Sequence, residues 1–308
     1  HLDEFTPASQ VFGLAQGIQV DLGEAGGFLR GHMGVTTNSP EDALNISNVA
    51  NGLVSLSIGA EGLPGIVDER SGRAYAALFS VESEQDRGDL HTPEIVPGTL
   101  RTARNKGVRR LAEGPLVGAI EWQWVVRPEG GGVVDGRTVL SLRANEPVVR
   151  VRVEFDHDAQ DHRLRLRLPL GLREVEAGSP LGGVRRGPGQ LDRSWPEEAV
   201  LPTAPASEFV ASTAAAAPVR IAAVGFFEYQ LEPGGSVLLT LLRAVGQLSV
   251  PDSSGRRGHA AWPMATPTAQ EPGRHVFEFQ LRFEAGASPE DFFPLFIRKA
   301  SGRGAAPG

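Results

Sequence analysis

Two short segments of the 308-residue chain bring carboxylates and imidazoles close enough together to do chemistry. Residues 84–91 (EQDRGDLH) hold three carboxylates, an arginine and a histidine, and residues 156–162 (DHDAQDH) hold three aspartates and two histidines. Paired carboxylates hydrolyse glycosidic bonds, and Asp and His side chains ligate divalent metals. A solvated acidic loop is the competing interpretation of the first segment.

The second segment joins two alternating runs, and Val149–Leu170 as a whole predicts a β-hairpin. A hairpin tip sends alternate side chains to opposite faces, so few of these five polar groups would converge on a metal. The favoured interpretation is a polar turn fixed by an Asp161–Arg163 ion pair and by backbone hydrogen bonds, with a metal site as the alternative.

A third candidate is the buried run 239–249 (LTLLRAVGQLS), followed by a Gly/Ser loop that ends in Arg256 and Arg257. Arginines in such a loop could clamp a hydroxylated or anionic ligand, although a surface pair is the ordinary alternative. The sequence contains no G-x-S-x-G, H-E-x-x-H or P-loop motif.

The elements that must position these residues are strands. Gly and Pro separate many short alternating runs, the pattern of an all-β sandwich with few helices. In the hairpin, the arginine face opposite the apolar face suits a surface that another domain covers. The predicted strands are residues 52–58, 76–81, 119–126, 138–142, 148–155, 163–168, 220–224, 236–242 and 275–283.

Composition excludes several classes of function. The chain has no cysteine, which rules out disulfides and thiolate chemistry and fits a cytoplasmic location. Its formal charge of −7, without a basic patch, argues against nucleic-acid binding. No apolar run approaches the length of about 20 residues that spans a membrane.

The ordered motifs resemble the C-terminal β region of glycoside hydrolase family 38, the α-mannosidases. The resemblance covers about Asn51 to Phe283. The matching pieces are NGLV (51–54), GIVD (65–68), SGR (71–73), DRGDLH (86–91), DHRLR (161–165), FEY (227–229), LTLLRAVGQLS (239–249) and TPTAQ (266–270) with Gly273 and His275.

This resemblance implies a large antiparallel supersandwich of the galactose-mutarotase type over residues 51–285, after a lead-in at 1–50 and before a partly disordered extension at 286–308. It implies that the parent enzyme hydrolyses α-mannosides with retention, using zinc and two carboxylates of an N-terminal catalytic portion that this sequence lacks. The chain alone is then expected to hold no catalytic residue, metal or cofactor.

The same resemblance places contacts to the α-mannoside or oligosaccharide substrate in the loops of the sandwich. His91 falls where the family has a tyrosine-like aromatic, and Arg257 falls on the arginine of the Gly/Ser loop, with Arg256 as the one-residue alternative. Asp89 is a further candidate for substrate binding.

Two other functions stay open. A stand-alone carbohydrate-binding module would use Trp122, Trp124, Trp195 or Trp262 as a stacking platform for sugar rings. A mutarotase-like epimerase would need a histidine and a carboxylate in one cleft, for which His91 with Asp89 is the compact pair. Assembly of the chain into a homo-oligomer is open as well.

Overall fold

The computed structural model describes residues 48–59, 62–180, 182–189, 201–214, 218–223 and 228–283. Strands dominate this part of the chain, as the all-β prediction requires. They are β1 (Asn48–Ala50), β2 (Val54–Ile58), β3 (Pro64–Asp68), β4 (Arg73–Tyr75), β5 (Ser80–Gln85), β6 (Arg101–Thr102), β7 (Arg104–Glu113), β8 (Val117–Val126), β9 (Val134–Arg143), β10 (Val148–His157), β11 (His162–Pro169), β12 (Val175–Ser179), β13 (Gly182–Arg186), β14 (Thr203–Pro205), β15 (Phe209–Ser212), β16 (Arg220–Ala223), β17 (Glu228–Leu231), β18 (Ser236–Ala244) and β19 (Gly273–Arg282). A 3-10 turn, η2 (Pro267–Gln270), precedes β19.

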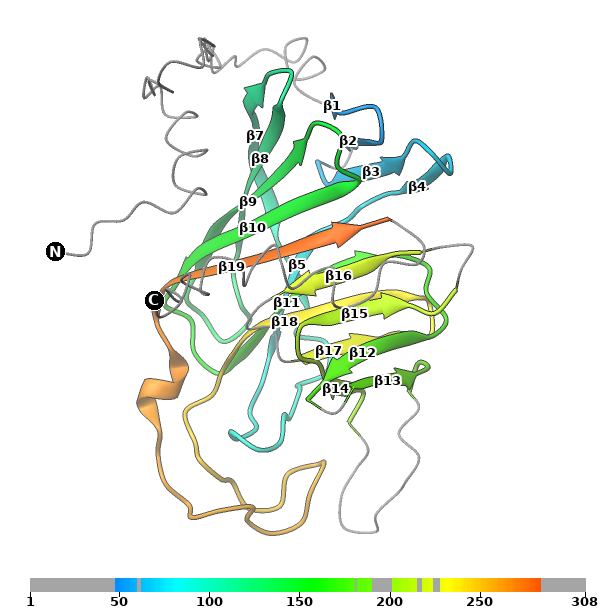
Figure 1. The fold of residues 1–308 in the computed structure, drawn as a ribbon. Helices are drawn as coiled ribbons and strands as arrows, with labels where there is room; N and C mark the ends of the chain where they lie inside the picture. Colours follow the sequence, from blue (N-terminus) through cyan, green and yellow to red (C-terminus); the bar gives the residue numbers. More distant parts are fainter. Residues whose placement is uncertain are drawn as a thin grey trace, which may run out of the picture.

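The strands form three antiparallel sheets (Figure 1). The large sheet has nine strands in the order β13-β12-β15-β16-β19-β10-β9-β8-β7. A six-stranded sheet, β14-β17-β18-β11-β5-β6, lies behind its β12–β16 end, and a four-stranded sheet, β1-β2-β3-β4, lies beside the other end (Figure 1). Phe79, just before β5, contacts Phe279 of β19 with ring centroids 6.2 Å apart, which joins the two larger sheets.

The core lies where the apolar faces of these sheets meet. Trp122 and Trp124 of β8 share a face, as their spacing predicts, and both are fully buried. The indole of Trp124 donates to Thr138 Oγ1 over 3.1 Å and lies over Gly136 of β9. A Cβ at Gly136 would come within 2.5 Å of the Trp124 ring, so this pairing requires glycine.

The predicted hairpin over Val149–Leu170 is wrong, because its two strands belong to different sheets. β10 pairs with β9 and β19, whereas β11 pairs with β5 and β18. Residues 158–161 therefore cross between sheets. At the crossover Asp161 has a left-handed φ of 50°, its N–H donates to Gln270 Oε1 over 3.0 Å, and its carbonyl accepts from the N–H of Asp86 over 2.8 Å. Alternation correctly predicts which face of each strand carries the apolar side chains but does not specify the partner strand.

The arginines of β11 are neutralised within their own sheet. Arg163 and Arg165 are buried, and both donate to the Glu84 carboxylate, over 3.0 and 2.6 Å. The predicted Asp161–Arg163 ion pair is therefore wrong, since Arg163 binds Glu84 and Asp161 Oδ1 accepts from Gln270 Nε2 over 2.7 Å. Docking of a further domain on this face stays a prediction.

Other expectations need smaller corrections. The strand predicted at 76–81 begins only at Ser80, because Ala77 and Phe79 have positive φ values of 52° and 64° and turn the chain after β4. Residues 1–47 and 284–308 lie outside the described residues, so the predicted lead-in and extension stay predictions. Within the described ranges, no helix is long and apolar enough to cross a membrane.

Two buried histidines lie where the crossover meets the core. The rings of His157 and His162 have centroids 5.5 Å apart, and both side chains are buried. His157 Nε2 contacts the carbonyl of Glu271 at 2.6 Å, and His162 Nδ1 contacts Ser83 Oγ at 3.1 Å. Burial lowers the pKa of both imidazoles, and it lowers that of His162 to about 4, helped by the neighbouring His157.

This burial predicts that the fold weakens in mild acid. Because the folded pKa of His162 lies below its unfolded value of 6.5, its contribution is complete above pH 6.5 and is lost as the pH falls toward 4. We expect the free energy of unfolding to fall by about 2 kcal/mol from His162 alone between pH 7.5 and 5. Urea unfolding at both pH values measures it.

The matched variant is His162→Phe, which keeps a ring in place but cannot bind a proton. Its unfolding free energy should change less between pH 7.5 and 5 than that of the unmodified chain. Equal pH dependence of the two proteins would contradict the assignment. Aspartate and glutamate titrate mainly below this window, so they do not obscure the comparison.

Candidate functional site

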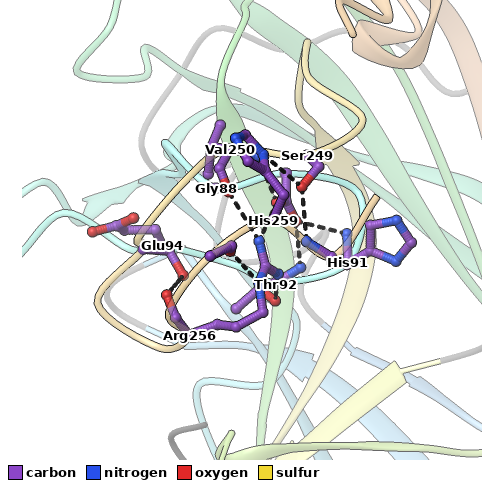
Figure 2. Close-up of polar contacts among 12 residues, drawn as sticks. Gly88, His91, Thr92, Glu94, Ser249, Val250, Arg256 and His259 are labelled. Carbon is purple, nitrogen blue, oxygen red and sulfur yellow. Dashed lines mark hydrogen bonds and ion pairs between the residues drawn. The ribbon is translucent and has the colours of Figure 1, made fainter. Parts of the chain in front are cut away.

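Topology brings two of the three candidate segments to one edge of the six-stranded sheet. β5 and β18 lie on either side of β11 and are both antiparallel to it, so they end at the same edge. The segment after β5, residues 86–95, and the segment after β18, residues 245–266, therefore leave the sheet side by side. The N–H of Leu90 donates to the carbonyl of Gln247 over 3.1 Å. We call these two segments the loop cluster (Figure 2).

Asp86 anchors the base of the loop cluster. Its buried carboxylate accepts from Arg243 Nε at the end of β18 over 2.6 Å and from the N–H groups of Gly88 and Glu94, each over 2.9 Å. A Cβ at Gly88 would lie 2.1 Å from the carbonyl oxygen of Thr92, so only glycine fits this close turn.

Asp89 and Arg256 form the centre of the loop cluster. Asp89 Oδ1 accepts from the N–H groups of His91 and Thr92 over 2.9 and 2.8 Å. Asp89 Oδ2 accepts from the N–H of Val250 and from Arg256 Nη2, each over 2.8 Å. Both charged side chains are buried, so the pair joins the two loops by charge-assisted hydrogen bonds that are shielded from water.

Arg256 is satisfied on every side of its guanidinium. It donates from Nη2 to the carbonyl of Val250 and from Nε to the carbonyl of Gly258, each over 3.1 Å, and from Nη1 to Thr92 Oγ1. Burial would raise the pKa of Asp89, but the hydrogen bond from Arg256 and those from backbone amides outweigh it and hold that pKa well below its usual range. The Asp89 carboxylate therefore stays ionised at neutral pH.

The four predicted substrate-binding residues separate into a buried pair and an exposed pair. Asp89 and Arg256 have internal partners for their polar groups, whereas His91 and Arg257 are exposed on the same two loops. The ring of His91 points away from the cluster in Figure 2. The geometry thus makes Arg257, rather than Arg256, the arginine that a ligand can reach.

The compact histidine–carboxylate pair of the epimerase interpretation does not form. The backbone N–H of His91, not its ring, donates to Asp89, and that carboxylate faces the buried centre of the loop cluster. A sugar epimerase needs both groups at one substrate. The structure therefore contradicts the use of His91 with Asp89 for proton transfer.

Sequence reasoning missed further contacts that complete the loop cluster. Ser249 Oγ lies 3.3 Å from His259 Nδ1 and accepts from the N–H of Ala260 over 3.0 Å. Glu94 Oε1 accepts from the N–H of Ser254 over 3.3 Å. In the described part of the chain no carboxylate orients the His259 ring, as a nucleophile–base–acid triad requires. Ser249 and His259 are ten residues apart, but no pattern along the chain marks them as a pair.

A cluster of paired charges lies on the nine-stranded sheet, beside an open hollow of about 500 Å³ that Glu154, Arg137 and Arg274 help to line. Burial would raise the pKa of Glu154, but Arg137 and Arg152 hold it at about 2. Retaining hydrolysis needs one carboxyl group whose raised pKa lets it donate a proton. Neither Asp89 nor Glu154 can serve as that acid.

The Asp/His crossover, residues 156–162, sends its polar side chains to separate partners. The contacts are His157 Nε2 with the carbonyl of Glu271, Asp158 Oδ1 with the N–H of Val133, Asp161 Oδ1 with Gln270 Nε2, and His162 Nδ1 with Ser83 Oγ. Among the residues with a described position, no three His, Cys, Asp or Glu side chains are arranged to hold a metal. These residues do not fit a zinc ion, and the polar turn is the interpretation that the geometry supports.

The tryptophans also divide by burial. Trp122 and Trp124 lie in the core, so neither can form a stacking platform, and that part of the prediction is wrong. Trp262, on the second segment of the loop cluster, is 83% exposed. Trp195 lies outside the described residues.

The central pair predicts that Asp89→Asn loosens both loops. The change leaves the Arg256 guanidinium buried without its counter-charge, and we expect a loss of about 3 kcal/mol in unfolding free energy. Hydrogen exchange of the amides of His91, Thr92 and Val250, which donate to Asp89, should quicken. Arg257→Ala, which changes the exposed arginine next to Arg256, is the matched control and should leave these exchange rates unchanged.

Unchanged exchange at all three amides in Asp89→Asn would contradict the anchoring role of this carboxylate. Faster exchange throughout the protein, without a local difference, would point to general destabilisation instead. Exchange measured by mass spectrometry on short peptides separates the two results.

Comparisons with known proteins come from structure alone. No family model matches the sequence, and no curated protein matches it. The structure of an α-mannosidase from Enterococcus faecalis V583 superposes with a TM-score of 0.68 at 19% identity, covering 83% of this chain. That of a glycosyl hydrolase family 38 protein from Enterococcus faecalis superposes with a TM-score of 0.63, at the same identity and coverage.

The chain spans about a third of the length of these proteins, 31% of the first and 32% of the second. These superpositions establish a shared fold, and an identity of 19% leaves the activity open. The expected resemblance is thus confirmed as one of architecture: this chain has the all-β fold of one part of these larger structures.

Proposed function

We propose that this chain is the β-sandwich portion of a family 38-type α-mannosidase, a glycosidase that hydrolyses α-mannosides with retention. In this proposal it supports the active site and supplies contacts at its rim. The observation that carries the proposal is the superposition of 83% of this chain on an α-mannosidase. The buried Asp89–Arg256 pair, which fixes two loops while leaving His91 and Arg257 exposed on them, supports the role at the rim.

Rigid loops are suited to a domain that positions the substrate for a reaction that another portion of the enzyme catalyses. Precise placement of substrate contributes to catalysis only when the contacting side chains are held within a narrow range of geometry. The Asp86 and Asp89 carboxylates hold the loop backbone through five hydrogen bonds from N–H groups, those of Gly88, Glu94, His91, Thr92 and Val250. An imidazole and a guanidinium on such loops can bind sugar hydroxyls.

The reacting groups are assigned to an N-terminal catalytic portion of the same polypeptide. The low pKa values of Asp89 and Glu154 support this division of labour, because neither carboxyl group can donate a proton near neutral pH. Zinc, which would hold sugar hydroxyls, belongs to that portion as well. The absence of cysteine from the sequence supports a cytoplasmic location for the enzyme.

A second function, a carbohydrate-binding module, is favoured by one observation. Trp262 is strongly exposed on the same loops, and the flat face of an exposed indole can stack on a sugar ring. The two functions agree on the ligand class and differ in whether the chain acts without a catalytic partner.

The assay is turnover of an aryl α-mannoside, with metal content measured on the same samples. The purified chain alone should give no turnover and no bound zinc, and adding the N-terminal catalytic portion should restore activity. In the combined enzyme, His91→Ala or Arg257→Ala should each lower kcat/KM by about tenfold through lost transition-state contacts. Arg87→Ala, an exposed arginine on the same loop, is the control and should have little effect.

Turnover by the chain alone with stoichiometric zinc would overturn the proposal. Binding of mannosides without any effect of His91 or Arg257 on the combined enzyme would favour the carbohydrate-binding module. Wild-type activity in both variants would show that the side chains of His91 and Arg257 do not contact the substrate.

A further inference from the structure

The nine-stranded sheet has a polar face that the rim contacts do not use. Side chains alternate along β10, so Phe155 is buried in the core whereas Glu154 and Asp156 lie on the opposite face. The open hollow of about 500 Å³ lies on this polar face, over β7, β8, β9, β10 and β19. Sites for small ligands have volumes of about 300–1,000 Å³, so the hollow is large enough to hold one.

A buried carboxylate anchors the charged groups at the floor of the hollow. Glu154 Oε2 accepts from Arg137 Nη2 of β9 over 2.7 Å and from Arg274 Nη2 of β19 over 2.9 Å. The side chain of Arg137 is 39% exposed and that of Arg274 is 60% exposed. Both guanidinium groups are therefore held by one buried partner while they remain open to solvent. Groups that are already held lose less entropy when a ligand binds.

The strand register places donors and acceptors next to each other across this floor. Two neighbouring cross-strand rows line the hollow, Gln123–Arg137–Glu154 and Asp135–Asp156–Arg274. Lys106 neutralises Asp135, with Nζ 2.7 Å from Oδ2. Asp156 is exposed and has no ion pair or side-chain hydrogen bond within the described ranges. Its carboxylate is therefore an acceptor that a ligand can use.

The charges of the hollow cancel, and this limits the class of ligand. The three cations are Lys106, Arg137 and Arg274, and the three anions are Asp135, Glu154 and Asp156. A surface without net charge gives no electrostatic preference for an ion of either sign. Guanidinium groups only donate and carboxylates only accept, whereas a hydroxyl group does both. A neutral ligand with several hydroxyl groups can use both kinds of partner at once.

We propose that this hollow is a second saccharide-binding site, which holds an oligosaccharide on the nine-stranded sheet, separate from the loop cluster on the six-stranded sheet. Arg274 donates to hydroxyl groups of the sugar, and Asp156 accepts from them. The neutral, hydroxyl-rich class follows from the hollow itself, whereas the choice of an α-mannoside rests on the proposed function. The site retains a long substrate and takes no part in its hydrolysis.

The observations favour a sugar over an ion or an apolar ligand. An anion bound by Arg274 would lie beside Asp156, its cross-strand partner, and the two negative charges would repel each other. A cation bound by Asp156 would meet Arg274 in the same way. Among the described lining residues the only apolar side chain is that of Phe155, and it is buried, so an apolar ligand would find no matching surface.

The test is a calorimetric titration with an α-linked mannotriose. The protein is the whole chain carrying His91→Ala and Arg257→Ala, so that contacts at the rim do not contribute to the signal. We expect saturable binding that Asp156→Ala and Arg274→Ala each weaken by about tenfold, because each change removes hydrogen bonds between a charged group and the sugar.

Arg185→Ala, in the same background, is the matched control. Arg185 is also an exposed arginine that pairs with a glutamate of the nine-stranded sheet, Glu176, but it lies on the edge strand β13. The affinity for mannotriose should not change in this variant. Thermal unfolding of each variant checks the fold, and in Arg274→Ala the Glu154 carboxylate keeps its hydrogen bonds from Arg137 and Arg152.

Several results would overturn the proposal. These are no saturable binding in the background protein, full affinity in both Asp156→Ala and Arg274→Ala, or an equal loss of affinity in Arg185→Ala. Inorganic phosphate should not compete with mannotriose, and competition would identify an anion site in place of a sugar site.

The second site and the proposed function can fail separately. The proposed function is tested by turnover of the combined enzyme on an aryl mannoside, and the readout there is the effect of His91 and Arg257. If those effects are present but the background protein does not bind mannotriose, only the second site is refuted. If mannotriose binds in the hollow but His91 and Arg257 have no effect on turnover, only the rim contacts are refuted.

Discussion

The carboxylate of Asp89 and the guanidinium of Arg256 meet in the interior of the loop cluster, and the candidate site depends on that contact. Each group would be costly to bury alone, and together they satisfy each other and five backbone groups. Because the pair is directional, it sets the spacing of the two loops. The exposed residues of those loops are therefore held at a fixed distance from one another, and the buried pair thereby determines which groups a ligand could contact.

The strand order of the six-stranded sheet brings together the two loops that carry this contact. Its order places β5 and β18 on either side of β11, so that their following loops emerge together. Asp86 and Arg243 then join the loop bases, and Glu84 neutralises the buried Arg163 beside them. Charged residues thus run from the sheet edge into the loop cluster as a series of local pairs. The fold, with its core of apolar side chains beneath, acts as a rigid base for the loops.

Much of the fold could be predicted from sequence, and the failures have a common cause. Alternation identifies the strands and the buried faces, as Trp122 and Trp124 show, because periodicity is a local property. The partner of a strand is not local, and so β10 and β11 were expected to pair although they belong to different sheets. Asp89 and Arg256 were both named as candidates, but they are 167 residues apart and nothing local indicates that they bind each other. Chemistry along the chain placed both in candidate segments, and the motif resemblance then named them as candidate substrate contacts.

The most direct measurement of the central claim is a crystal structure of this chain together with the N-terminal catalytic portion that the proposed function requires and a bound mannose-like inhibitor. The account predicts that His91 and Arg257 lie within hydrogen-bonding distance of the sugar hydroxyls, about 3.5 Å or less, with the Asp89–Arg256 pair intact behind them. A sugar bound away from the loop cluster, or contacted by Asp89 or Arg256 after their pair has opened, would contradict it.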